Sequence, residues 1–181
     1  MHYHHKKVKV ILGIILLLTA LYIPLSRKSF IAVEANTYPL RGFKAPEFEL
    51  SDLINKSYKL SSYKGKTVVI FFWTSWCNVC KGIMPELQEF YQVSDIDHFE
   101  ILAINATSQD QEENAKSYAK NSQFTFPILY DTQGIVMNEF RVRAFPTAYV
   151  IDPEGVIQDI VIGSGLTRVY LLTQIENFPR N

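Results

Sequence analysis

The chain has 181 residues, 48% of them hydrophobic, which suits one globular domain of ordinary size. Its 18 Lys and Arg residues balance 18 Asp and Glu residues, so no chain-wide field would hold nucleic acid, and we expect no nucleic-acid partner. It has only two cysteines, which excludes a small scaffold held together by several disulfides and directs attention to one local pair.

The N-terminus combines a basic start with an apolar run. Residues 1–9 contain three lysines, and residues 10–25 are almost all apolar. The run is short for a spanning helix, which needs about 17–25 residues, but Arg27 or Lys28 could snorkel and extend it. We therefore predict a short cytoplasmic N-terminus at 1–9, a transmembrane signal-anchor helix at 10–25 and a tether at 26–42. The three lysines outnumber the two basic residues after the run, so the positive-inside rule places the rest of the chain on the extracytoplasmic side of the cell membrane.

Two alternatives to the anchor remain open. A cleavable signal peptide requires small residues soon after the apolar run, whereas this chain has Tyr22, Pro24 and Arg27 there. The nearest acceptable cleavage site, at residues 33–35, lies far downstream. An apolar core helix would also account for the run, but a basic segment followed by an apolar one near the start of a chain is typical of membrane insertion. We favour the uncleaved anchor.

From residue 43 onward, apolar runs alternate with amphipathic stretches. The apolar runs are rich in β-branched and aromatic residues and predict strands at 47–50, 57–60, 67–73, 99–105, 127–130, 147–151 and 156–162. Helices are predicted at 78–92, 110–121, 135–140 and 168–178. Residues 152–155, Asp-Pro-Glu-Gly, are a turn signal that joins the last two strands as a hairpin. The alternation predicts a single α/β domain at 43–181, with helices on both faces of a central sheet.

The strongest chemical signal is a C-x-x-C pair where a buried strand meets a helix, in residues 73–80, Trp-Thr-Ser-Trp-Cys-Asn-Val-Cys. A thiol at a helix N-terminus faces unpaired backbone N–H groups and the positive end of the helix dipole, which stabilise the thiolate. Cys77 is therefore the expected nucleophile. One helical turn separates the two sulfurs, so Cys80 can attack a mixed disulfide formed on Cys77 and release the substrate.

Three other uses of a C-x-x-C pair fit this sequence less well. A zinc site needs two more ligands, and His98 is the one histidine beyond the N-terminal segment. Covalent haem attachment needs a histidine directly after the second cysteine, where this chain has Lys81. A pair of inert core thiols is disfavoured by the strand-to-helix junction beside Trp76. We expect no metal site, and no cofactor besides a redox-active disulfide between Cys77 and Cys80.

Residues 43–178 resemble the thioredoxin superfamily and, within it, the membrane-anchored TlpA/ResA-like proteins. The motifs that carry the resemblance are Ala-Pro at 45–46, Phe-Trp at 72–73, Trp-Cys-Asn-Val-Cys at 76–80, Pro85 and Phe-Pro-Thr at 145–147. The resemblance implies a thioredoxin-like three-layer fold with a central mixed β-sheet flanked by helices. It also implies thiol:disulfide exchange with extracytoplasmic protein thiols or disulfides, and a membrane electron-transfer partner that recharges the pair.

The resemblance further implies roles for three residues beside the cysteines. Pro146 is identified as the cis-proline that faces the active-site disulfide, although base rates alone would favour a trans bond. In the family, the backbone of the residue before this proline binds the substrate peptide. Phe145 is therefore expected to shape the docking surface, together with Trp76.

The chain departs from the family pattern around the second thiol. Two buried acids of relatives are missing, because thioredoxin's aspartate aligns with Phe71 and the ResA-type glutamate aligns with Ile83. Glu86 is the nearest acidic residue in sequence, and we expect it at the surface. A thiol in an apolar pocket resists ionisation, so we expect slow resolution of mixed disulfides by Cys80 at neutral pH.

Two rival functions come from other classes. A thiol peroxidase of the peroxiredoxin type uses the motif P-x-x-x-[ST]-x-x-C, and Ile70 stands where its proline should be. A tethered copper(I) metallochaperone would use the thiols as soft ligands, but no methionine or histidine cluster accompanies them. The residues leave the direction of electron flow open. The resemblance favours a reductant, with cytochrome c maturation as one candidate role that the missing acid at Ile83 weakens.

Overall fold

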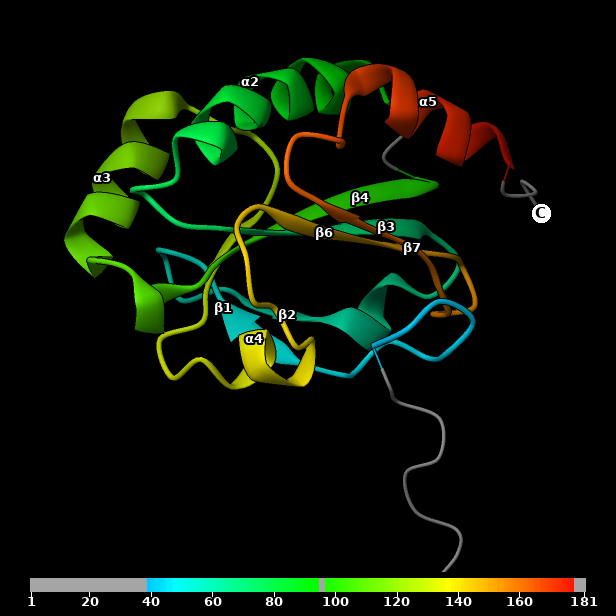
Figure 1. The fold of residues 1–181 in the computed structure, drawn as a ribbon, viewed down its shortest axis with the longest axis horizontal. Coiled ribbons are helices and arrows are strands. Elements are labelled where there is room, and N and C mark those ends of the chain that lie inside the picture. Colours follow the sequence, from blue (N-terminus) through cyan, green and yellow to red (C-terminus); the bar gives the residue numbers. More distant parts are fainter. Residues whose placement is uncertain (1–38, 95–96, 178–181) are drawn as a thin grey trace, which may run out of the picture. The chain divides into compact units, whose positions relative to one another are not determined.

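The computed structural model describes residues 39–94 and 97–177, which belong to one compact unit (Figure 1). The predicted N-terminus at 1–9 and signal-anchor at 10–25 lie outside these residues, as does most of the predicted tether. No helix in the described part of the chain is both long enough and apolar enough to cross a membrane. At the end of the predicted tether, the Gly42 N–H donates to the Ile157 carbonyl and Arg41 forms an ion pair with Asp159, so these residues contact the domain.

Five strands of the described chain form one mixed sheet, in the order β5-β4-β3-β6-β7. Parallel pairing joins β3 (Thr67–Trp73), β4 (Phe99–Asn105) and β5 (Ile128–Tyr130), and antiparallel pairing joins β3 to β6 (Thr147–Ile151) and β6 to β7 (Ile157–Ile162). All residues of β3 and β4 are buried, because both faces of these central strands are covered. Full burial explains why their sequences are continuously apolar rather than alternating.

Helices cover the two faces of this sheet and produce three layers (Figure 1). On one face, α2 (Asn78–Val93), α3 (Glu112–Ser122) and α5 (Arg168–Asn177) contribute to a core that includes Phe71 and Trp73 of β3. On the other face, α4 (Ile135–Glu139) contributes to a second core. Successive side chains of a strand point to opposite faces, so β3 supplies both cores. The predicted thioredoxin-like α/β fold with a mixed sheet is confirmed.

A small hairpin lies beside the second core. Its strands, β1 (Glu49–Ser51) and β2 (Ser57–Lys59), pair antiparallel and are followed by a 3₁₀ turn, η1 (Leu60–Tyr63). The Asp52 carboxylate accepts N–H bonds from Ile54 and Lys56 and closes the turn between the strands. Each strand has three residues, where the sequence predicts four, at 47–50 and 57–60. The second strand ends at Lys59 because the 3₁₀ turn begins at Leu60.

Candidate redox site

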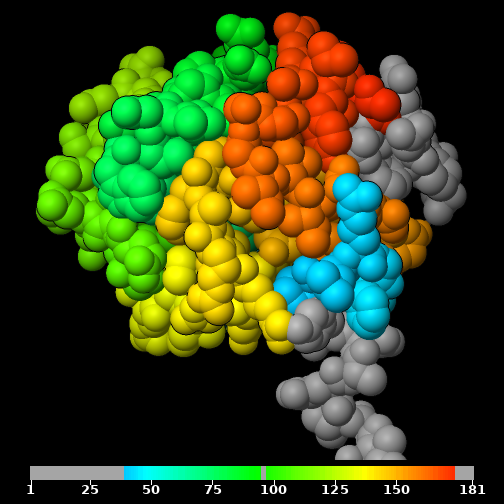
Figure 2. All heavy atoms as spheres, in the orientation of Figure 1, coloured from blue at the N-terminus to red at the C-terminus, as the bar shows by residue number. Residues whose placement is uncertain are grey.

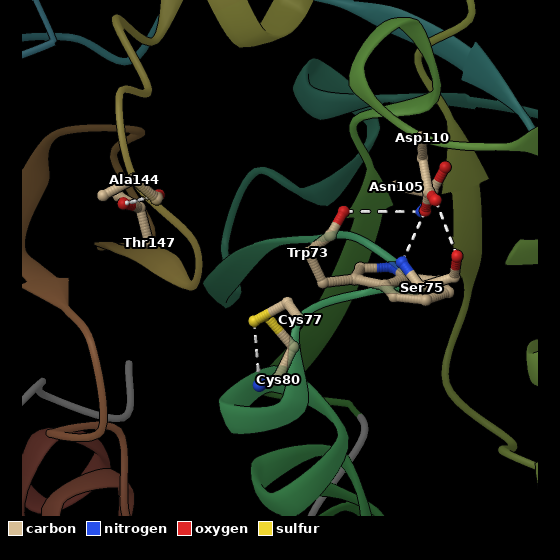
Figure 3. The surroundings of a disulfide bond; sticks show 8 residues. All are labelled: Trp73, Ser75, Cys77, Cys80, Asn105, Asp110, Ala144 and Thr147. Atoms are coloured by element: carbon tan, nitrogen blue, oxygen red, sulfur yellow. Dashed lines mark hydrogen bonds between the residues drawn. A yellow bond between two sulfur atoms is a disulfide. The ribbon is translucent and has the colours of Figure 1, made fainter.

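The two cysteines lie at the start of α2 and are joined by a disulfide (Figure 3). Cys77 is the N-cap residue of the helix, and its Sγ accepts the backbone N–H of Cys80 at 3.1 Å. The first turn of α2 carries no acidic residue that would offset the positive end of the helix dipole. Cys77 is 6% exposed and Cys80 is fully buried, so Cys77 is the sulfur open to a protein substrate.

A side-chain network holds the loop between β3 and Cys77 (Figure 3). The Asp110 carboxylate accepts hydrogen bonds from the Ser75 N–H, from the Ser75 hydroxyl at 2.6 Å and from the Asn105 amide at 2.9 Å. The Trp76 indole N–H donates to the Gln109 carbonyl at 2.9 Å. These bonds tie the redox loop to the short 3₁₀ segment η2 (Thr107–Gln109) and the residue after it.

Asp110 has a different place from the one that the sequence predicts. The pattern placed it at the start of a helix over 110–121, whereas α3 begins at Glu112 and Asp110 belongs to the loop network. Its position shortly after a buried strand was the one available signal, since side chains that follow parallel strands collect at one edge of the sheet. Nothing in the local sequence connects it to Ser75, which is 35 residues away.

The peptide bond between Phe145 and Pro146 is cis. The Phe145 ring packs against the core that contains both cysteines, and it contacts the Trp76 ring edge-to-face at a centroid distance of 5.8 Å. The Pro146 carbonyl accepts the Gly163 N–H at 2.9 Å, which joins this turn to the end of β7. Figure 2 shows the start of α2, the segment around Pro146 and the segment after β7 side by side on one face of the molecule.

The predicted substrate-binding residues are therefore close together. Trp76 is 59% exposed, while Phe145 is half-buried beneath it. Val79, in the first turn of α2, is also exposed, so the surface beside Cys77 is apolar. An apolar surface of this kind suits contact with a protein chain rather than with a small charged substrate.

The environment of Cys80 is apolar, as its sequence neighbours predict. Phe71 and Ile83 are both buried and belong to the same core as the Cys80 sulfur. Glu86 is exposed, and the Lys81 ammonium lies over the Tyr118 ring, 5.5 Å from its centroid. Phe71 and Ile83, the two positions at which the resemblance led us to look for a buried acid, thus place apolar side chains in the core that holds Cys80.

The described residues offer no second ligand set for the thiols. No group of three His, Cys, Asp or Glu side chains within 39–94 and 97–177 is placed to hold a metal ion. Both thiols belong to a cluster of buried hydrophobic side chains.

Comparison with known proteins adds to this geometry. Residues 42–160 match the AhpC/TSA family. The thiol-disulfide oxidoreductase ResA of Geobacillus thermodenitrificans is 37% identical over 123 residues, which are 68% of this chain and 70% of that protein. The thioredoxin-like protein YneN of Bacillus subtilis is 37% identical over 124 residues, which are 68% of this chain and 72% of that one.

Two solved structures show the same fold at lower identity. The crystal structure of StoA from Bacillus subtilis superposes with a TM-score of 0.64 at 26% identity, covering 73% of this chain and 97% of that one. The pneumococcal exposed lipoprotein thioredoxin Etrx1 of Streptococcus pneumoniae superposes with a TM-score of 0.66 at 28% identity, covering 74% of this chain and 100% of that one. Both likenesses span nearly the whole of the other protein's chain.

Proposed function

Because this chain belongs to the AhpC/TSA family and is a thiol-disulfide oxidoreductase of the ResA/TlpA type, we propose that it reduces protein disulfides outside the cytoplasm. The observation that carries the proposal is the Cys77–Cys80 pair at the start of α2, beside the exposed Trp76 and the cis bond before Pro146. The direction of electron flow rests on the resemblance to ResA-like proteins. The location rests on the basic and apolar segments at residues 1–25.

The proposed reaction uses both thiols in turn. In the reduced protein, the Cys77 thiolate attacks one sulfur of a client disulfide, and the other client sulfur leaves as a thiolate. The Cys80 thiolate then attacks the Cys77 sulfur, which breaks the mixed disulfide and releases the second client thiolate. Two electrons have moved to the client, and the protein holds the Cys77–Cys80 disulfide. A membrane electron-transfer partner returns two electrons and completes the cycle.

The protein contributes a stabilised nucleophile and a docking surface. The N–H of Cys80, which points at the Cys77 sulfur, stabilises a thiolate there by a charge-assisted hydrogen bond. Trp76 and Phe145 form the apolar wall against which a client segment packs, and the backbone of Phe145 is the proposed partner of an extended client strand. Oxidised apocytochrome c is one client that this role would include. Ile83, in place of the acid typical of ResA-like proteins, argues against a role restricted to it.

Neither rival function gains support from the site. Ile70 is fully buried within β3, where the peroxidase motif requires a proline in a loop that binds peroxide. A copper(I) chaperone binds the metal through two free thiolates. Such binding does not require the protein to exchange disulfides. Titrating copper(I) into the reduced and the oxidised protein, alongside an assay of disulfide reduction, separates binding from exchange.

The redox equilibrium of the cysteine pair tests the proposal. The protein is equilibrated in dithiothreitol or glutathione buffers of known potential, and the free thiols of Cys77 and Cys80 are counted by alkylation. We expect a reversible disulfide with a reducing potential, nearer to the roughly −270 mV of thioredoxin than to the roughly −120 mV of the strong oxidant DsbA. An oxidising potential would assign the protein to disulfide donation, and the lack of any reversible disulfide would assign the pair to metal binding or to structure.

A further inference from the structure

The segments that meet at the redox site carry charge of one sign only. They are residues 74–82 around the cysteines, 141–147 before and into β6, and 162–168 from the end of β7 to the start of α5, and they lie side by side (Figure 2). Their charged residues are all basic: Lys81, Arg141, Arg143 and Arg168. The whole chain has 18 residues of each sign. These three segments, called here the redox face, are therefore positive in a chain that is neutral overall.

Arg143 is held on this face close to the cis bond. The Val142 N–H before it donates to the Met137 carbonyl at 3.0 Å, and the Val142 side chain is buried. The Ala144 carbonyl after it accepts the Thr147 hydroxyl at 2.8 Å. The Arg143 side chain itself is exposed, and no carboxylate in the described part of the chain forms an ion pair with it. The backbone is thus fixed while the guanidinium is open to a partner.

Two further cations add to the positive potential. Arg168, the first residue of α5, is exposed. Lys81 lies in the first turn of α2, and its contact with the Tyr118 ring leaves its charge uncompensated by any anion. The positive ends of both helix dipoles act in the same direction. Asp110 contacts the redox loop, where its carboxylate oxygens already accept three hydrogen bonds.

Exposed apolar side chains accompany these cations. Trp76 is 59% exposed, and Val79 and Ile162 are also exposed. A surface that is both basic and apolar suits either an acidic protein segment or an anionic lipid surface. Cys77 distinguishes the two, because its sulfur belongs to the same face. A membrane that covered the face would separate this sulfur from every client disulfide, so the surface favours a protein segment.

We propose that the redox face selects client disulfides that are flanked by Asp or Glu, and that Arg143 determines this preference. The inference rests on the proposed exchange with protein disulfides and adds which clients are preferred. A client carboxylate pairs with the Arg143 guanidinium as the client segment lies along Phe145. The cations also offset the repulsion between an acidic client and the Cys77 thiolate, which raises the rate of productive encounter.

Three synthetic peptides test the proposal. Each has one cysteine activated as a 2-pyridyl disulfide and flanked by two Asp, two Asn or two Lys residues. The reduced full-length chain, in a neutral detergent, is mixed with each peptide. The Cys77 thiolate attacks the peptide sulfur, and the released pyridine-2-thione is followed by its absorbance. Each rate is divided by that of the same peptide with 2-mercaptoethanol, an uncharged thiol, which corrects for the intrinsic reactivity of the peptide.

We expect the Asp peptide to react about tenfold faster than the Asn peptide at low salt, and the Lys peptide to react more slowly than both. Added salt should reduce these differences, because it screens exposed charges. Equal rates for all three peptides would overturn the inference and leave the proposed thiol–disulfide exchange intact. A faster reaction of the Lys peptide would overturn it as well. No reaction with any peptide would overturn the proposed function, and the inference with it.

Variants of exposed residues test the role of Arg143. Arg143→Gln should bring the ratio of the Asp rate to the Asn rate down to about one, and Arg143→Glu should make the Lys peptide the fastest. Lys64→Gln is the matched control, because it removes one exposed charge beyond the other end of β3, roughly 20 Å from the redox loop. It should keep the preference. An equal decrease for all three peptides in Arg143→Gln would overturn the assignment, because Arg143 would then act on the Cys77 thiolate alone.

The lipid alternative is tested in the same assay. Vesicles of phosphatidylcholine, with or without one third phosphatidylglycerol, are added before the peptides. We expect the Asp peptide to keep its advantage with both kinds of vesicle, because a client and not a lipid surface occupies the redox face. Loss of the advantage with the anionic vesicles alone would assign the face to anionic lipid and overturn the proposal.

Discussion

Cys80 lies among buried hydrophobic side chains. Its sulfur is fully buried with Phe71 and Ile83, and the nearest acid in sequence, Glu86, is exposed. Because burial without a partner disfavours the thiolate, the step in which Cys80 attacks a mixed disulfide should be slow at neutral pH. The step should become faster as the pH rises and more of the thiol ionises.

Placing an acid beside Cys80 should accelerate this step. In Ile83→Glu, a carboxylate would stand where ResA-like relatives carry one, and we expect the mixed disulfide to resolve at least about tenfold faster at pH 7. Ile83→Gln is the matched control, because it buries a similar polar group without a base. Both variants should lose about 1–3 kcal/mol of stability. Stopped-flow decay of a mixed disulfide between Cys77 and a chromophoric thiol gives the rate, and equal rates in the two variants would contradict the prediction.

Glu100 is a second buried group with an altered proton affinity. Burial raises its pKa above the ordinary 4.5, although the Tyr91 hydroxyl and the Ile101 N–H donate to its carboxylate and act in the opposite direction. The folded chain therefore retains this proton to a higher pH than the unfolded chain does. The stability that the group contributes falls as pH rises through the interval above 4.5.

Removing this charge should stabilise the protein at neutral pH. Glu100→Gln keeps an oxygen that can accept from Tyr91 and Ile101 and removes the cost of burying a carboxylate. We expect urea denaturation at pH 7 to show a higher midpoint for the variant than for the unchanged protein. The difference should shrink toward pH 4, where Glu100 is protonated in both the folded and the unfolded chain. A difference that does not depend on pH would assign the effect to packing.

At the scale of elements, the accuracy of prediction followed burial. The sequence predicted β3, β4 and β6 with the bounds that the structure has, because both faces of these strands are covered and their sequences are continuously apolar or β-branched. The pair at the start of α2 was likewise predictable, because strand-to-helix junctions have a local pattern. The Asp110 network was not, because it joins segments whose proximity depends on the completed sheet.

The redox loop should depend on Asp110. Asp110→Ala leaves the Ser75 N–H, the Ser75 hydroxyl and the Asn105 amide without their acceptor, and we expect a loss of about 1–3 kcal/mol in stability. Disulfide reduction should also become slower, because Cys77 follows this loop directly. Asp110→Asn, which keeps one acceptor oxygen, should lose less. The two effects are measured by urea denaturation and by turnover of insulin, and a slower turnover at unchanged stability would still support a positioning role.

At the scale of the whole molecule, the chain combines a redox domain with a basic and apolar N-terminus. The domain is described from residue 39, and the anchor proposed at residues 10–25 precedes it. Membranes from cells that produce the full-length chain provide the test. After extraction with alkaline carbonate, we expect the intact chain to stay in the membrane pellet, because a spanning helix is held by the hydrocarbon core. Release of the intact chain into the supernatant would contradict the anchor, and release of a shortened chain would indicate cleavage.

Hydrogen bonds hold the segments on both sides of Cys77 in place. Asp110 and the bond between Trp76 and Gln109 hold the loop before it, and the residues after it already belong to α2. Sulfur exchange requires the attacking sulfur to be oriented correctly toward the disulfide that it breaks. Because hydrogen bonds hold the loop before Cys77 and α2 follows it, we expect the client disulfide, rather than Cys77, to move into this alignment. We therefore expect this protein to exchange disulfides faster in loose or incompletely folded chains than in rigid domains.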